Sequence, residues 1–297
     1  MMFLEALQLG CGIDMRSRLI WVGSGTCAAL LGGFVVSSRR SKVVSSADAL
    51  IEPPKPSGQQ WDYNWDRRAP ESSVKPPAPG SNLEKYEIKL EEARPTAVRN
   101  LLLVRHGQYE QYTKEKWLTD LGREQAELVG DHLQRLNLPI TKIVWSSKNR
   151  ATETGKIISK YFEGVPTEAC DLLREGLPLA AAEPLHPTWP LMEQERFTQG
   201  MQMEAGFRKH FHRAPSSQTE DSYEIISCHG NVIRYYVLRA LQLPASAWIN
   251  LSAYNASLTW LQIAPDGRVN LVLFGDTGFI PPHKITYWIG PGCPEWS

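Results

Sequence analysis

Short apolar runs separated by amphipathic segments fill the chain from about residue 97 onward. Leu101–Val104 is a continuous apolar run, which is typical of a strand buried on both faces. The segments 142–146 and 223–228 are the next strand candidates. Helices are expected between and after these strands, at about 119–137, 150–162, 190–212 and 231–241. Alternating strands and helices predict an α/β fold with a mostly parallel central sheet.

Capping and turn residues locate the ends of several of these elements. Thr119 or Asp120 precedes an apolar stripe and predicts the N-terminus of a helix there. The tripeptide Pro265-Asp266-Gly267 lies between two apolar segments, 258–263 and 269–274. These two segments therefore form a predicted hairpin at the end of the domain.

The N-terminal part of the chain contains an uncharged segment, Leu19–Ser38. As a helix it would be about 30 Å long, close to the hydrocarbon thickness of a bilayer. Basic residues precede it and a basic cluster follows it, so we expect a single-pass anchor whose orientation is not decided by charge. A cleaved signal or transit peptide and a buried soluble helix are the two alternatives.

A linker is expected between this segment and the domain. Residues 45–80 contain seven prolines, a composition that favours an extended chain. One island, WDYNWDRR at 61–68, interrupts it, with two Trp four apart and two Asp four apart. On a helical turn, the two indoles would share one face and the two carboxylates another. We expect the island to dock on another subunit or partner; packing against its own domain is the alternative.

A charged stretch, 84–94, predicts a short helix leading into the domain.

Composition narrows the class of protein. The chain of 297 residues has 32 basic and 32 acidic residues, which argues against a general nucleic-acid binder. A hydrophobic fraction of 42% and ten Trp exclude wholesale disorder. Five scattered Cys form no CxxC pair or Cys/His cluster, so neither a disulfide framework nor a structural zinc site is predicted.

Cationic residues follow three of the predicted strands. Arg105 and His106 come after the first strand, Arg150 shortly after the second, and His229 after the segment 223–228. Ligands in open α/β sheets lie beyond the carboxyl ends of the strands, so these side chains are expected to form one cationic pocket. Guanidinium groups bind phosphate as a fork. Each His is followed by Gly, which we expect to let the backbone approach a ligand.

An acidic partner for this pocket is Glu175, in the segment LREG. Taken singly, each residue has an ordinary structural alternative. Arg150 could pair with Glu153, His229 could be a structural imidazole, and Glu175 could be an exposed loop residue. The combination favours a phosphate site, because all these alternatives would have to hold together.

Four short motifs carry a resemblance to a known family. They are RHG at 105–107, SxxRAxxT at 147–154, LREG at 173–176 and HG at 229–230. In this order they resemble the histidine phosphatase (phosphoglycerate mutase-like) superfamily. The chain is most similar to the membrane-anchored mitochondrial serine/threonine phosphatases of that superfamily, through the segments WDYNWDRR (61–68), LGREQAE (121–127), DSYEIISCHGNVIRY (221–235) and GDTGFIPPHKIT (275–286).

This resemblance implies an enzyme mechanism. His106 would be the nucleophile that becomes a phosphohistidine, and Arg105, Arg150 and His229 would hold the phosphoryl oxygens. Glu175 would protonate the leaving oxygen and then activate water. The implied activity is hydrolysis of phosphoserine and phosphothreonine in proteins, with phosphohistidine as a further substrate class. No metal or other cofactor is implied.

The resemblance also implies an organisation of the chain. A three-layer phosphatase domain at 97–286 would follow an N-terminal segment (1–18), the anchor (19–38) and the linker (39–96), and a tail would end the chain (287–297). The location would be a mitochondrial membrane, outer or inner. Phosphoproteins would be the substrates and nucleic acid would not be a partner. Self-association to a dimer or higher oligomer, which would raise activity, is implied for the WDxNWD motif: Trp61, Asp62, Asn64, Trp65 and Asp66.

Two other functions stay open. One is a small-metabolite phosphatase or phosphoglycerate mutase, and the other is an oligomeric scaffold with an incidental pocket. A mutase must retain its phosphate under a lid, and the 54 positions between Glu175 and His229 leave little room for one. The segment 180–190 is the expected rim of the substrate site, where His186 would shape the rim rather than react.

Overall fold

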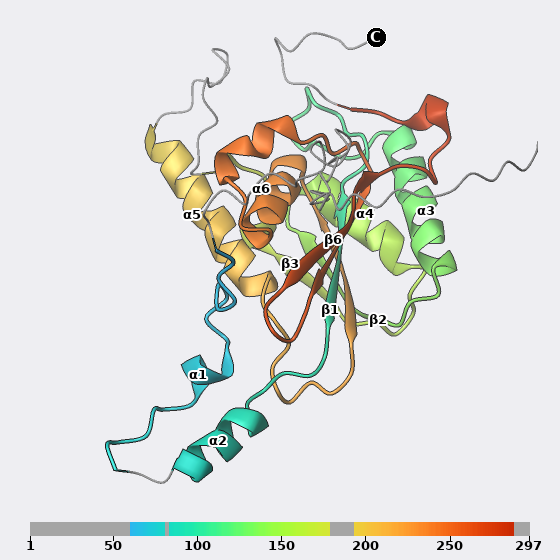
Figure 1. Cartoon of the computed structure of the whole chain (residues 1–297). Coiled ribbons are helices and arrows are strands. Elements are labelled where there is room, and N and C mark those ends of the chain that lie inside the picture. The colour runs from blue at the N-terminus through green and yellow to red at the C-terminus, as the bar shows by residue number, and fades with distance from the viewer. Residues whose placement is uncertain (1–59, 81–82, 179–192, 288–297) are drawn as a thin grey trace, which may run out of the picture. The chain divides into compact units, whose positions relative to one another are not determined.

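The computed structural model describes residues 60–80, 83–178 and 193–287 (Figure 1). A six-stranded sheet with the order β3-β2-β4-β1-β5-β6 lies at its centre. The strands are β1 (Arg99–Arg105), β2 (Ile140–Ser146), β3 (Thr167–Cys170), β4 (Ser222–Cys228), β5 (Leu258–Ile263) and β6 (Val269–Asp276). The helices are α1 (Pro70–Ser73), α2 (Leu83–Glu92), α3 (Asp120–Arg135), α4 (Asn149–Ser159), α5 (Glu193–His210) and α6 (Gly230–Ala240), with short 3₁₀ turns η2 (Asp171–Leu173), η3 (Ala245–Asn250) and η4 (Pro282–Lys284).

The sheet is mixed, and most of its strand pairs are parallel, as the alternation of strands and helices predicted. The pairs β1–β4, β2–β4 and β2–β3 are parallel, whereas β5 is antiparallel to both β1 and β6. The antiparallel edge is the predicted hairpin, which turns at residues 264–268. The parallel core of β3, β2, β4 and β1 is the part that aligns several strand ends at one edge.

Helices cover both faces of the sheet, so the domain has three layers (Figure 1). All seven residues of β1 are buried, and successive side chains alternate between the two faces. Leu101 and Leu103 belong to the core formed with α5 and α6, whereas Leu102 and Val104 belong to the core formed with α3 and α4. Burial on both faces explains why this strand is continuously apolar.

Most predicted elements are present, whereas the short elements α1 and β3 were not predicted. Thr119 is the N-cap of α3, and its side chain accepts a hydrogen bond from the Gly122 amide, which satisfies an amide at the start of the helix. The helix expected at 84–94 is α2. β3 was not predicted, because its sequence TEAC is only four residues long and carries too little apolar signal.

Part of the WDxNWD motif is anchored on the domain that follows it. The Asp66 carboxylate and the Arg213 guanidinium form an ion pair of 2.9 Å, with side chains that are 1% and 2% exposed. Trp65 donates from Nε1 to the carbonyl of Gly267 at 2.8 Å and packs against the ring of Phe207 at 5.7 Å between centroids. This is the alternative interpretation that the sequence left open, packing against its own domain.

The WDxNWD motif does not form a helical turn, so the faces that such a turn would create are absent from it. Residues 63–66 form a hydrogen-bonded turn rather than a helix, and the two carboxylates do not share a face, since Asp66 is buried and Asp62 is exposed. Asn64 bridges to Ser72 through Nδ2 at 2.8 Å. The Trp61 indole N–H is buried without a hydrogen-bond partner among the described residues. Local polar contacts replace helical ones here, as is common for Asn and Asp in turns.

The predicted anchor at 19–38 lies outside the described residues. Within the described ranges, none of the helices has the length and apolar character that a membrane span requires.

Candidate active site

Three parallel strand segments deliver the predicted cationic residues to one edge of the sheet. His106 directly follows β1, and His229 directly follows β4 as the N-cap of α6. The β1–β4 register pairs Arg105 with Cys228, and the His106 amide donates to the Cys228 carbonyl at 3.0 Å. The two imidazole rings therefore lie next to each other, 5.1 Å apart between centroids. Arg150, in the first turn of α4 after β2, completes the group.

The orientation of His106 suits a nucleophile. Its Nδ1 lies 2.8 Å from the Gly107 carbonyl oxygen. A carbonyl can only accept, so Nδ1 carries the proton and Nε2 has the free lone pair. Nε2 accepts a hydrogen bond from Nε of Arg150 at 3.0 Å. The reactive nitrogen thus faces a guanidinium group and does not turn away from it.

His229 and Glu175 face one another across the same space. Nε2 of His229 lies 2.8 Å from the Ser146 hydroxyl, which leaves Nδ1 on the other side of the ring. That nitrogen is fully buried, has no hydrogen-bond partner among the described residues and lies 4.0 Å from Oε2 of Glu175. A buried polar atom without a hydrogen-bond partner costs free energy, so Nδ1 of His229 is suited to contact a bound group.

The electrostatics of the site keep both imidazoles neutral. Burial lowers the pKa of His106 well below its ordinary value, and the charges of Arg150 and Arg105 lower it further. Burial and the charge of Arg150 also lower the pKa of His229 well below its ordinary value. Burial also lowers the pKa of Arg105 to about 10, so its guanidinium still carries a charge at neutral pH. A neutral imidazole between charged guanidiniums is the form that can attack phosphorus.

Glu175 has the opposite shift. Burial raises the pKa of this carboxyl, and the charges of Arg150 and Arg105 partly oppose that rise. A raised pKa favours the protonated acid, which can give a proton to a leaving oxygen.

The charge of the site fits an anion rather than a metal ion. His106, Glu175 and His229 present ligand atoms that all lie within 4.8 Å of one another, a spacing that a metal ion could use. However, Arg105 and Arg150 are buried beside them, 6% and 7% exposed. Two buried positive charges oppose a divalent cation and favour a phosphoryl group.

The two glycines beside the His residues differ in how closely other atoms approach them. A Cβ atom on Gly107 would lie 2.3 Å from the carbonyl oxygen of Gly122 in α3, and a Cβ on Gly230 would lie 3.4 Å from Nε of Arg105. Gly107 therefore lets the His106 loop lie against α3. Gly230 makes no such close approach, and the expectation that these glycines let the backbone approach a ligand stays a prediction.

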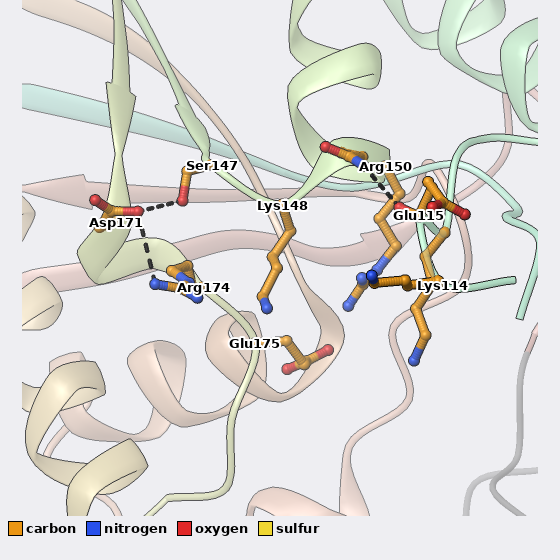
Figure 2. A pocket seen from close by; sticks show the side chains of 10 residues that line it. Lys114, Glu115, Ser147, Lys148, Arg150, Asp171, Arg174 and Glu175 are labelled. Atoms are coloured by element: carbon orange, nitrogen blue, oxygen red, sulfur yellow. Dashed lines mark hydrogen bonds and ion pairs between the residues drawn. The ribbon is translucent and has the colours of Figure 1, made fainter.

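A pocket of about 720 Å³ adjoins the site. Figure 2 shows Lys148 and Arg150 extending into it from the start of α4, on the side where Glu175 lies. Lys114, Glu115, Lys116, Ser147, Lys148, Asn149, Arg150, Asp171, Arg174 and Glu175 line the pocket. His186 and the segment 180–190, the expected substrate rim, lie outside the described residues.

Several supporting residues were missed by the sequence analysis. Asn255 donates from Nδ2 to the His106 carbonyl at 3.2 Å, and Thr154 accepts from the Gly107 amide at 3.2 Å. Tyr287 is the first residue of the tail, and the centroid of its ring lies 5.8 Å from Cζ of Arg105. Thr154 is the last residue of the SxxRAxxT motif at 147–154, so the sequence could have indicated it. Asn255 and Tyr287 come from distant parts of the chain and carried no local signal.

Comparisons with known proteins show what the chain is similar to. The model of the histidine phosphatase superfamily (branch 1) matches residues 101–277. The serine/threonine-protein phosphatase PGAM5, mitochondrial, of Mus musculus is 43% identical over 297 residues, covering 96% of this chain and 99% of that protein. The protein of the same name from Homo sapiens is 43% identical over 301 residues, with the same coverage. The crystal structure of phosphoglycerate mutase from Plasmodium falciparum is 32% identical, covers 65% of this chain and 100% of its own, and has a TM-score of 0.46.

Proposed function

The chain belongs to the histidine phosphatase superfamily, and from that premise we propose that it hydrolyses phosphoserine and phosphothreonine in proteins through a phosphohistidine on His106. Relatives that are 43% identical over nearly their whole length are named serine/threonine-protein phosphatases. The observation that carries the proposal is the buried, neutral His106, whose Nε2 faces the Arg150 guanidinium at 3.0 Å.

The first step transfers the phosphoryl group to the enzyme. The phosphate displaces the Arg150 contact to His106, so that Nε2 attacks phosphorus while the bond to the serine or threonine oxygen breaks. Arg105 and Arg150 stabilise the charge on the equatorial oxygens, and the free Nδ1 of His229 donates to one of them. Glu175, whose pKa is raised by burial, gives its proton to the leaving oxygen.

The second step releases the phosphate. The Glu175 carboxylate left by the first step takes a proton from a water molecule, whose oxygen attacks phosphorus as the N–P bond breaks. The reaction returns Glu175 to its protonated form and His106 to its neutral form. Each step uses groups that this chain supplies, so the mechanism needs no metal.

The experiment that tests this function is phosphate release from a phosphopeptide by the full-length chain. His106→Ala should reduce turnover by at least about 10³-fold and form no phosphoenzyme, because covalent catalysis needs the nucleophile. His283→Ala is the matched control, since His283 is exposed and lies outside the site. Turnover should persist in EDTA. Full activity of His106→Ala would refute the nucleophile assignment, and loss of activity in EDTA would refute metal independence.

The same assay separates the alternative enzyme functions. A small-metabolite phosphatase or mutase would act on 3-phosphoglycerate in preference to the phosphopeptide. We expect the phosphopeptide to be the better substrate.

The proposed setting of this activity is a mitochondrial membrane, outer or inner. Relatives of the chain are named mitochondrial, and the segment 19–38 is proposed as the anchor that precedes a tether at 39–96 and the domain at 97–286. We also propose that the WDxNWD motif drives self-association. A motif that inserts Trp65 and Asp66 into its own domain can exchange with the same segment of a second copy, and a shared membrane raises the effective concentration for that exchange.

A further inference from the structure

Positive charge continues beyond the catalytic group along the wall of the pocket. Lys148, the N-cap of α4, is half-buried and extends into the pocket beside Arg150 (Figure 2). Lys114, Lys116 and Arg174 also line the pocket, and their side chains are exposed. The whole chain has no net charge, so this local excess of cations is a property of the pocket.

These cations are only partly neutralised by the acidic residues of the pocket. Asp171 accepts a hydrogen bond from the Ser147 hydroxyl and lies 3.8 Å from Arg174 in a mostly exposed pair. Glu175 belongs to the catalytic group, and Glu115 is exposed. Within the part of the chain that the structure describes, the Lys148 ammonium forms no ion pair and no hydrogen bond.

The surroundings of Lys148 disfavour its charge. Burial lowers its pKa, and the charges of Arg174, Arg150 and Lys116 lower it further. The three other cations therefore each repel the charge on Lys148. An anion placed among them would relieve that repulsion.

The phosphate that reacts with His106 cannot neutralise all of these cations. It is held by Arg105, Arg150 and His229 at the buried end of the site, next to His106. The pocket, at about 720 Å³, has room for a second group. We propose that Lys148, with Lys116 and Arg174, forms a second anion subsite, and that the enzyme prefers phosphoserine or phosphothreonine peptides with a carboxylate side chain next to the phosphorylated residue.

The form of the subsite favours an acidic peptide over a small molecule with two anionic groups. A small ligand of that kind would be held by buried, converging forks, as the phosphate is. The outer cations here are exposed and spread around an open pocket. They suit the carboxylates of an extended chain that lies across the rim. This inference rests on the proposed phosphatase function.

The test compares two phosphoserine peptides that differ only in Glu or Gln on both sides of the phosphoserine. Because Glu and Gln have the same shape, a difference in kcat/KM reports charge alone. The wild-type, full-length chain should prefer the Glu peptide by about three- to ten-fold, the range expected for a few exposed ion pairs. The preference should shrink as salt shortens the Debye length. Lys148→Ala should reduce it by about two- to five-fold, and Lys148→Glu should reverse it.

A control variant and a second substrate make the outcomes distinct. Lys156→Ala, on the exposed side of the same helix, should leave the preference unchanged. Equal rates for the two peptides, or an unchanged preference in Lys148→Glu, would overturn the subsite and leave the phosphatase function standing. 3-Phosphoglycerate carries its carboxylate and phosphate in one small molecule. If it were hydrolysed while neither peptide was, the proposed function would fall and the subsite with it.

Discussion

Individual side chains in the site gain their properties from burial next to charge. His106 and Glu175 lie in the same group, yet burial pushes their pKa values in opposite directions, because it disfavours the charged form of each. Both shifts favour the uncharged form, a neutral base at His106 and a neutral acid at Glu175. Two ionisable groups with pKa values shifted in this way can work as nucleophile and proton donor.

The Glu175 assignment predicts a specific pH profile. The carboxyl must be protonated in the first step, so the rate of that step should fall as pH rises through its raised pKa. Glu175→Gln should lower turnover of a phosphoserine peptide by about 10²–10⁴-fold and remove that alkaline fall. With p-nitrophenyl phosphate, whose leaving group needs no proton, the loss should be much smaller. An equal loss on both substrates would rule out the general-acid role.

The nucleophile and the cationic residues were accessible to sequence analysis because each follows a recognisable strand, whereas Glu175 follows β3, which was not predicted. His106, Arg150 and His229 stand at strand ends, where parallel sheets place ligands. The residues that orient them were less accessible. The Ser146 hydroxyl that contacts His229, and the Asn255 amide that holds the His106 carbonyl, act across 83 and 149 positions respectively, a pairing that no local pattern encodes.

At the scale of elements, α3 supports the catalytic loop through backbone packing. A Cβ atom on Gly122, in the first turn of α3, would lie 1.9 Å from the carbonyl oxygen of Gln108. The Gln108 amide in turn donates to Oε1 of Gln125, from the same helix, at 2.8 Å. The start of α3 therefore fixes the loop that carries His106.

Gly122→Ala should test this support. The new methyl group must push the loop away, which should lower stability by about 1–3 kcal/mol and kcat by tenfold or more. Gly130→Ala is the matched control in the same helix, because its Cβ would meet the Tyr161 ring at 2.6 Å, away from the site. Urea unfolding and kcat should show a loss of stability in both variants and a loss of turnover only in Gly122→Ala. Normal kcat in Gly122→Ala would mean that the loop tolerates the shift.

The sequence indicated most elements but not their full arrangement. Long periodic segments such as α3 and α6 were predicted within a few residues, whereas β3, with four residues, was not. The order of the sheet follows from long-range pairing, such as the parallel contact of β4 with both β1 and β2. The antiparallel attachment of β5 to β1 was likewise not contained in any local signal.

At the scale of the whole molecule, the segment before the domain is part of its packing. Burial alone would raise the pKa of Asp66, but the hydrogen bonds and charge of Arg213 outweigh it and hold the pKa below its usual value. The pair therefore stabilises the fold at neutral pH, and its contribution is lost only as the pH falls below about 4.

Asp66→Ala should therefore lower the free energy of unfolding by about 3–5 kcal/mol, since it leaves Arg213 buried without its partner. Asp62→Ala, at the exposed carboxylate of the same motif, should change it by less than about 1 kcal/mol. Urea unfolding measures both values. Light scattering on the same variants tests the proposed self-association. If the motif drives it, Asp66→Ala should form smaller particles than the wild type. Equal stability of the two variants would show that the segment is not anchored through Asp66.

The order of the sheet has a consequence for synthesis of the protein. β1 and β2 leave the ribosome first, yet they are not neighbours, because β4 lies between them. The pairing of β1 and β2 with β4 cannot be completed until residue 228 has been synthesised, more than a hundred residues after the start of β1. Until then β1 lacks its parallel partner, and β2 can pair on only one edge, with β3. The central pairing of the sheet is therefore completed only after most of the domain has been synthesised.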